Sequence, residues 1–553
     1  TREHSDLPRR LRRVILTVPT AMPLAEQRIF QRWARWAVGM VWRSLGWDQW
    51  LTDGKVSPGG PPPLRPDYRL SPEVRCKWDE ATCTQLVHLY NEISEKYQGD
   101  VQHLFRLVGK PRPDYGLQPS VRVASIDIGG GTIDLSITTF ESEGDASSSA
   151  RLVPHQELRE GFNIAGDDVV CAVIEDHVLR DLGAALKKAG VGEPRKLLSN
   201  LFGGDRPRMS RKDRNLRGQL ARQLFLPLAL RLLEQYEATD LRRGAPSFGG
   251  KLGDFFPPGQ GPHHNVLDYV ESSAREAGAR DFHLLESSLR VNASEIDLTI
   301  RRVLGNALAD LCELVHLYDC DLLLLTGRPS RWPAVTASVL AKLPVAPDRV
   351  LPMHQIKVGG WYPYSDDLGR IRDPKTTVVV GAILCALAEG HLEGFSFDTT
   401  RLALKPTARH LGEMDLDGRI PNSKVWFQVD PENKAELDQV REHTVLFSSP
   451  IAIGFRQLDV ERWTTKRYYT LDFSSPQAVT NAANKLPYRV TISHSYREDA
   501  KSPLGIRDEG LLSIENIEAK DGANARPQDL ELRLQTMRSE EGYWLDTGVF
   551  KVV

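Results

Sequence analysis

Cysteine is scarce in this sequence of 553 residues, which has only six, and none of them forms a Cys-x-x-Cys pair. Spacings typical of cysteine metal sites are missing as well, which argues against a disulfide framework or a zinc site. Most of the six lie in apolar runs. We therefore expect buried free thiols in a reducing compartment.

Long apolar runs and an excess of one charge are also missing. No run approaches the roughly 18 consecutive apolar residues that a bilayer-spanning helix needs, and no signal peptide is visible. The formal net charge of −2 gives no argument for binding nucleic acid or an acidic membrane surface. We expect a cytoplasmic protein without a membrane span or nucleic-acid partner. The chain opens on Thr1, so an earlier segment, and with it secretion, stays open.

The stretch Ser125–Thr138 (SIDIGGGTIDLSIT) is the feature around which the chain is organised. An apolar run leads into Gly129, Gly130 and Gly131, and an alternating run follows Thr132. The pattern predicts two strands joined by a tight glycine turn. Glycine lets backbone N–H groups approach an anion closely, and several such amides form an anion-binding nest.

Two carboxylates, Asp127 and Asp134, flank this turn. Paired carboxylates beside phosphates suit Mg²⁺, which usually takes one or two of them and keeps several waters. The local interpretation is a hairpin that binds phosphate and magnesium. The alternative is an ordinary glycine-rich hairpin with solvated aspartates, because glycine motifs have a high false-positive rate.

The letters DIGGGTID resemble the second phosphate loop of the actin, Hsp70 and sugar-kinase superfamily, in its Hsp70 form. Further stretches agree with that superfamily in its order: Val14–Thr20 with Gln27 and Arg28, Asp79–Thr82, Gly161–Asp168, Leu322–Pro333, and Asp373 and Pro374 with Val380–Ala382. The letters TGRPSR within Leu322–Pro333 are similar to the virulence factor SrfB family, a bacterial branch of this superfamily. Together these ordered matches are far more specific than any one of them.

This resemblance implies roles for particular residues toward ATP or ADP and magnesium. The phosphates would lie on Gly129, Gly130, Gly131 and Thr132. Asp127 and Asp134 would hold Mg²⁺ through water, and Glu80 would face the metal and the attacking water. The implied catalytic set is therefore Glu80, Asp127 and Asp134.

The adenosine is expected in a second loop, bounded by Gly327, Ser330 and Arg331. Arg328 stands where Hsp70-like proteins have a second glycine, so the nucleotide would approach differently there. Asp167 and Asp168 are interpreted as caps of the helix that follows them, where the helix dipole favours negative charge.

The superfamily also has a first phosphate loop, which should precede Val14. Only thirteen residues stand before that position, and none of them forms an Asp-x-Gly-Thr-like stretch. The lysine that usually follows that loop is not identified either. Either the N-terminal part is incomplete or the protein lacks half of the phosphate clamp, so ATP hydrolysis stays open.

The implied fold is α/β, with actin/Hsp70-like (ribonuclease H-like) ATPase lobes followed by a mostly β domain. We expect the remainder of the first lobe at 1–120, the second lobe at 121–390 with a helical insertion at about 183–290, and the β domain at 391–553. The β prediction rests on alternating or β-branched segments between polar turns. These are Lys424–Val429, Thr444–Arg456, Arg467–Phe473, Tyr488–His494, Leu511–Ile517, Leu530–Met537 and Tyr543–Val553.

Leu24–Leu45 has the apolar periodicity of an amphipathic helix. Its apolar face carries Ile29, Phe30, Trp33, Trp36, Ala37, Met40 and Val41. We expect this face, with both tryptophans, to pack in the core rather than to form a stacking platform.

Three functions fit these observations. The first is an ATP-binding protein, with hydrolysis left open, whose nucleotide state is coupled to an unidentified protein partner through the β domain. The second is a degenerate ATPase fold that acts as a scaffold or interaction protein. The third, a small-molecule kinase on the same fold, ranks last because no sugar-binding signature is visible.

Overall fold

A computed structural model describes residues 11–20, 22–45, 72–143, 151–205, 209–388, 392, 395–402, 408–430, 433–437, 439–463, 465–495, 511–534 and 543–552. The chain has the mixed α/β class that the sequence predicts. It divides into two compact units, each built from separate stretches of chain. Unit 1 comprises Thr1–Leu104, Thr138–Glu160 and Val378–Met537, and unit 2 comprises Phe105–Ile137, Gly161–Thr377 and Arg538–Val553.

Parallel strands form the centre of unit 2. Strand β9 (Leu322–Thr326) lies between β10 (Val350–Pro352) and β4 (Pro119–Ile128), and β5 (Ile133–Glu143) follows β4. All five residues of β9 are buried, as expected for a parallel strand covered on both faces. In the register of β4 and β9, Asp127 lies opposite Thr326. The carboxyl ends of these two strands therefore lie side by side.

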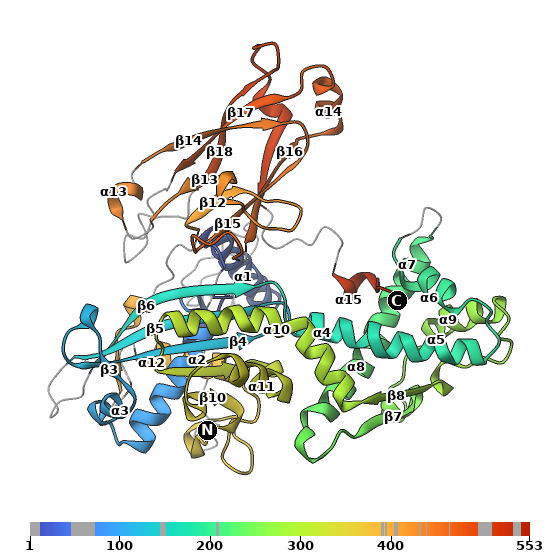
Figure 1. Ribbon diagram of the computed structural model, residues 1–553, viewed down its shortest axis with the longest axis horizontal. Coiled ribbons are helices and arrows are strands. Elements are labelled where there is room, and N and C mark those ends of the chain that lie inside the picture. The colour runs from blue at the N-terminus through green and yellow to red at the C-terminus, as the bar shows by residue number, and fades with distance from the viewer. Residues whose placement is uncertain are drawn as a thin grey trace, which may run out of the picture. The chain divides into compact units, whose positions relative to one another are not determined.

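Helices make up most of the remaining mass of unit 2 (Figure 1). They are α4 (Gly166–Val173), α5 (Leu179–Lys188), α6 (Pro194–Phe202), α7 (Arg211–Leu220), α8 (Leu226–Glu237), α9 (His264–Glu276), α10 (Ala293–Leu317) and α11 (Pro333–Lys342). An antiparallel pair, β7 (Ser247–Lys251) and β8 (Ser288–Asn292), lies among them, and a short β3 (Lys110–Pro111) pairs with β4.

The described C-terminal residues belong to unit 2 and contain a helical turn, α15 (Trp544–Thr547), beside α7 (Figure 1). The strand predicted at Tyr543–Val553 is therefore wrong. Arg217 Nε donates to the Thr547 carbonyl oxygen at 2.6 Å, and the Phe550 ring contacts the rings of Phe202 and Phe225. These long-range contacts fix the segment against the helices, which its local pattern does not reveal.

In unit 1, two antiparallel sheets account for most of the strands. One has the order β13-β12-β15-β16-β19 and the other the order β14-β17-β18. Their strands are β12 (His410–Glu413), β13 (Val425–Gln428), β14 (Arg441–Phe447), β15 (Ile451–Arg456), β16 (Lys466–Phe473), β17 (Tyr488–Ser495), β18 (Leu511–Glu518) and β19 (Leu530–Leu534). They confirm a strand in each of the other six predicted segments.

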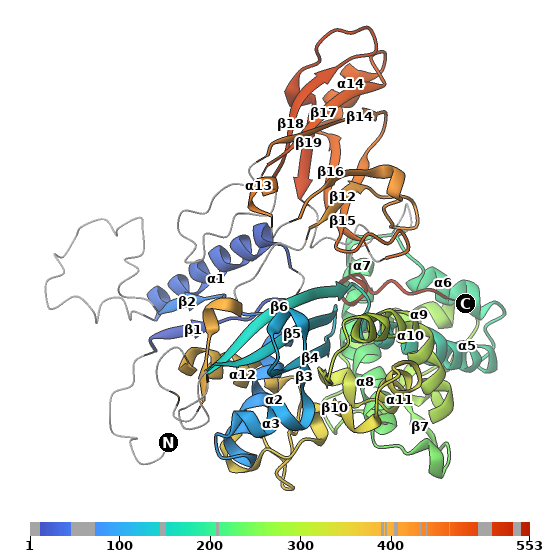
Figure 2. The same ribbon diagram turned by 60° about the vertical axis from the view of Figure 1, so that its left-hand side comes forward.

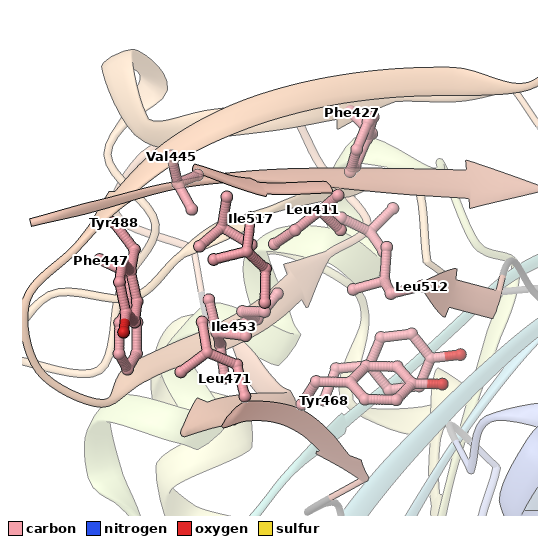
Figure 3. Packing of buried hydrophobic residues seen from close by; sticks show 14 of the residues in the cluster. Leu411, Phe427, Val445, Phe447, Ile453, Tyr468, Leu471, Tyr488, Leu512 and Ile517 are labelled. Carbon is pink, nitrogen blue, oxygen red and sulfur yellow. The ribbon is translucent and has the colours of Figure 1, made fainter. Parts of the chain in front are cut away.

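Both sheets contribute to one hydrophobic core (Figure 3). Leu411, Ile453 and Leu471 come from the first sheet, and Phe447 and Tyr488 come from the second. All five side chains are fully buried. Buried apolar side chains from both sheets pack against one another and enclose this core.

Further strands and helices complete unit 1. The end of β5 continues there, followed in the sheet by β6 (Arg151–Phe162) and β11 (Ser396–Phe397), while β1 (Arg13–Ile15) pairs in parallel with β2 (Glu73–Arg75). The helices are α1 (Leu24–Ser44), α2 (Glu80–Tyr90), α13 (Lys434–Leu437) and α14 (Pro476–Ala482), with α3 (Val101–Val108) and α12 (Thr376–Ala388) crossing the boundary between the units.

Helix α1 lies along β2 (Figure 2), but its apolar face does not pack in the core. Trp33 is 57 % exposed, Trp36 48 % and Met40 66 %. The predicted burial of both tryptophans is therefore wrong. The buried side of α1 instead carries Trp42 and Gln27. Periodicity identified the helix correctly but not which of its faces is covered.

Two helices of unit 1, α2 and α12, approach each other at a single glycine. A Cβ added to Gly381 would lie 2.0 Å from the carbonyl oxygen of Cys83. Only a residue without a side chain permits this contact. The run of small residues in α12 therefore serves close helix packing.

Replacing Gly381 by alanine should push α2 and α12 apart. We expect the free energy of unfolding to fall by about 1–3 kcal/mol, the usual effect of overpacking. Urea titration followed by circular dichroism measures this difference. Gly305→Ala on α10 is the matched control, because a Cβ there would meet no atom within 4 Å. Gly305→Ala should stabilise its helix by roughly 0.5–1 kcal/mol. Equal destabilisation by both substitutions would contradict the close contact between α2 and α12.

Candidate functional site

The glycine turn between β4 and β5 forms as the sequence predicts. The N–H of Gly129 donates to the carbonyl oxygen of Thr132 at 2.9 Å and closes the turn. The Thr132 hydroxyl donates to Asp134 Oδ2 at 2.6 Å. Asp127 and Asp134 are almost fully buried, with 1 % and 3 % exposure. Two carboxylates thus lie at the inner ends of an otherwise accessible loop.

The start of α4 packs directly against this turn. The N–H groups of Gly166 and Asp167 donate to the carbonyl oxygens of Gly129 and Gly130 at 3.0 and 2.8 Å. A Cβ on Gly166 would lie 3.0 Å from the Gly129 oxygen and 2.9 Å from Pro329 Cγ. Glycine at this position therefore allows α4 to hold the turn in place.

The loop after β9 packs against the end of β4, next to the glycine turn. Gly327 has φ +81°, and a Cβ there would lie 2.0 Å from the Ile128 carbonyl oxygen. The backbone N–H and the hydroxyl of Ser330 both donate to the Gly327 carbonyl oxygen, at 3.1 and 2.7 Å. Ser330 is fully buried and shapes the loop. The structure therefore brings together three segments that are far apart in the sequence: 127–134, 165–168 and 327–331.

The tip of the turn has the properties of an anion nest. Gly130 and Gly131 are exposed, and a Cβ on Gly131 would meet no atom within 4 Å. Their two backbone N–H groups find no hydrogen-bond acceptor in the part of the chain that the structure describes. Exposed backbone N–H groups of this kind can donate hydrogen bonds to phosphate oxygens.

A lysine that the sequence analysis missed lies beside Asp127. Lys375 Nζ is 3.4 Å from Asp127 Oδ2. The lysine is positioned because the Thr326 hydroxyl, at the end of β9, donates to the Pro374 carbonyl oxygen at 2.9 Å. The superfamily resemblance implies a lysine after the first phosphate loop and not at this position. The sequence feature that could have identified Lys375 is its position directly after Asp373 and Pro374, because that segment resembles the superfamily.

The two arginines of the third loop share one carboxylate. Arg328 Nη2 and Arg331 Nε lie 3.0 and 2.5 Å from the two carboxylate oxygens of Glu237, at the end of α8. Arg331 also donates to the carbonyl oxygen of Arg372. Both guanidinium groups are thus oriented by protein contacts. The place of the adenosine at Gly327, Ser330 and Arg331 stays a prediction.

Glu80 belongs to unit 1, as the first residue of α2. Asp79 caps this helix, accepting from the N–H and the hydroxyl of Thr82 at 2.8 and 2.7 Å. Arg159 Nε lies 3.4 Å from the same carboxylate. The cap fixes the backbone at Glu80, while its role beside metal and water stays a prediction.

The two aspartates at the start of α4 have different partners. Asp168 Oδ2 accepts from the Ala165 N–H at 2.8 Å, which is the capping contact expected of it. Asp167 accepts a hydrogen bond from the Tyr543 hydroxyl in the C-terminal segment. Burial and this carboxylate raise the pKa of Tyr543. The tyrosine therefore stays neutral and ties the C-terminal segment to the end of α4 that holds the turn.

No group of three or more histidine, cysteine, aspartate or glutamate side chains gathers among the described residues in a way that would hold a metal by itself. The hairpin offers two carboxylates, Asp127 and Asp134. That number suits Mg²⁺ when phosphate and water supply its other ligands. None of the helices in the described ranges is long and apolar enough to cross a membrane.

The sequence profile of the virulence factor SrfB family matches residues 1–551. The chain belongs to the SrfB family. The match spans both units and includes all three segments of the candidate site. None of the curated proteins compared with the chain matches it. The SrfB resemblance drawn from TGRPSR is thereby confirmed.

Asp168 makes the stability of the folded chain depend on pH in a way that can be tested. Burial raises its pKa above the ordinary value of 3.8, because desolvation outweighs the hydrogen bond from Ala165. The folded state therefore favours the protonated acid. That stabilisation is complete below about pH 3.8 and is lost as the pH rises through the pKa of the folded state.

Asp168→Asn stays neutral at every pH and keeps an oxygen that can accept from Ala165. Its free energy of unfolding, relative to the unsubstituted protein, should therefore increase between about pH 3 and about pH 7. Urea titrations across this range measure the difference. A relative stability that falls as the pH rises would show that the carboxylate charge is favoured in the folded state.

Proposed function

We propose that unit 2 of this SrfB protein binds Mg-ATP or Mg-ADP, with the phosphates on the turn Gly129–Thr132. The observation that carries the proposal is the exposed pair of amides at Gly130 and Gly131, held beside the buried carboxylates of Asp127 and Asp134. A Cβ on Gly131 would meet no atom within 4 Å, which leaves room for a ligand against the backbone there. These residues fit a phosphate group and a hydrated magnesium ion.

Each part of the site would have a distinct task. The amides of Gly130 and Gly131 bind phosphate oxygens, and Asp127 and Asp134 hold the water shell of Mg²⁺, which supplies positive charge against the phosphates. Lys375 contributes a further cation. Its ammonium group lies 3.4 Å from Asp127 Oδ2, so it offsets the charge of this buried carboxylate.

The loop Gly327–Arg331 receives the adenosine in this proposal. Arg331 is oriented by Glu237, and an oriented guanidinium can stack on the face of a base. Glu80 is the carboxylate that would act on water if ATP is hydrolysed. Nucleotide state would then be coupled to a protein partner through the two antiparallel sheets of unit 1.

Isothermal titration of the chain with Mg-ATP and Mg-ADP tests the phosphate site. We expect saturable binding that depends on magnesium. Asp127→Asn should abolish the magnesium dependence, because it removes one of the two carboxylates. Lys375→Gln should weaken binding roughly 10- to 100-fold, the usual effect of losing a charge-assisted hydrogen bond.

Matched substitutions at exposed positions of unit 2, Asp348→Asn and Lys342→Gln, serve as controls and should leave binding unchanged. Circular dichroism of every variant checks that it is folded. Folded protein that binds neither nucleotide would contradict the proposal and favour the scaffold function. Binding that both Asp127→Asn and Lys375→Gln leave intact would place the nucleotide elsewhere.

A further inference from the structure

We propose that helix α1 docks on an anionic lipid surface through its exposed basic and aromatic side, here called the α1 face. It consists of the apolar residues Ile29, Trp33, Trp36, Met40 and Val41 and the basic residues Arg28, Arg32, Arg35 and Arg43. The five apolar side chains are 37–66 % exposed. This inference is independent of the proposed nucleotide site, which lies in unit 2.

The α1 face is exposed because the opposite side of the helix is the one that is packed. Trp42 is 8 % exposed, and Gln27 donates from Nε2 to the Met22 carbonyl oxygen at 2.7 Å. The helix runs along β2. Its rotation about its own axis is therefore fixed, and the α1 face points away from the packed side.

Aromatic and basic residues on the α1 face contact one another. The rings of Trp33 and Trp36 meet edge to face with centroids 5.0 Å apart. The guanidinium carbon of Arg32 lies 5.8 Å from the centroid of the Trp36 ring. The arginines at positions 28, 32, 35 and 43 follow the helical repeat along one flank of the apolar stripe. A row of cations thus borders a row of large apolar side chains.

The charge of this face selects an anionic partner. The only acidic residue of α1, Glu26, is buried, whereas all four arginines are exposed. Interfacial helices that bind anionic lipid combine a basic face with tryptophan and aliphatic residues that enter the headgroup boundary. Tryptophan is enriched at membrane–water interfaces.

A lipid surface fits the α1 face better than a nucleic acid does. The two tryptophan rings are edge to face, so they present no pair of parallel planes between which a base could stack. Met40, Val41 and Ile29 are aliphatic and match acyl chains rather than bases. The net charge of −2 does not reveal the arginines of the α1 face, because acidic residues elsewhere in the sequence offset them in the sum.

Sedimentation of the full chain with vesicles tests the proposal. Vesicles of phosphatidylcholine mixed with phosphatidylglycerol should pellet the protein, and vesicles of phosphatidylcholine alone should not. Added salt should weaken binding, since screening reduces the attraction. Arg32→Gln with Arg35→Gln should lower the partition coefficient on the order of 25-fold, at about fivefold for each arginine near an anionic surface.

Trp33→Ala with Met40→Ala should also reduce binding, and it should reduce the blue shift of tryptophan fluorescence on adding anionic vesicles. Two control variants change comparable exposed residues elsewhere: Arg242→Gln with Arg243→Gln, and Leu298→Ala with Leu317→Ala. Both should bind as the unsubstituted chain does. The α1 variants change exposed side chains, and circular dichroism verifies their folding.

Three outcomes would overturn the proposal: no binding to anionic vesicles, equal binding to both vesicle types, or binding that the α1 variants leave unchanged. Light scattering of the chain without lipid adds a further test. A dimer that Trp33→Ala with Met40→Ala converts to a monomer would assign the α1 face to a second copy of the chain. Tighter binding to single-stranded nucleic acid than to anionic vesicles would assign it to that partner.

Discussion

The close backbone contact between the end of β4 and the loop after β9 is the constraint on which the candidate site depends. A Cβ on Gly327 would lie 2.0 Å from the Ile128 carbonyl oxygen, so only glycine allows the two chain segments to meet. The same constraint recurs where α4 begins, because Gly166 lies against Gly129. Buried parallel strands fix the positions of Asp127 and Thr326, and the glycines let the loops beyond them converge.

Charged side chains around the candidate site in unit 2 lie beside side chains of opposite charge. Lys375 lies against Asp127, and Glu237 orients both Arg328 and Arg331. Buried or half-buried charges are costly unless they are paired, which explains why these groups have partners. A ligand that carries phosphate and magnesium could exchange with such pairs without leaving a charge uncompensated.

Structural features that depend on neighbouring positions in the sequence could be predicted. The hairpin at Gly129–Thr132 and the buried strand at Leu322–Thr326 follow from glycine placement and from apolar runs, which are properties of neighbouring positions. Most strands of unit 1 follow from alternation in the same way. The family itself was recognised from a six-residue loop together with the order of the other motifs.

Contacts between distant segments could not be predicted. Lys375 and Glu237 reach the site only through tertiary packing. The motif at Asp373 and Pro374 marks the segment of Lys375, but no local pattern predicts its contact with Asp127 or that of Glu237 with Arg331. The C-terminal segment alternates like a strand, but Arg217 and the rings around Phe550 hold it on helices. Helix α1 illustrates the same limit, since periodicity defines two faces and only packing decides which one is covered.

Hydrogen exchange of the full chain with and without Mg-ATP tests the central claim most directly, because it reports on all three segments at once. The account predicts that amides in 127–134, 165–168 and 327–331 gain protection together, and only when magnesium is present. Protection confined to one of these segments, or to regions outside unit 2, would show that they do not form one nucleotide site.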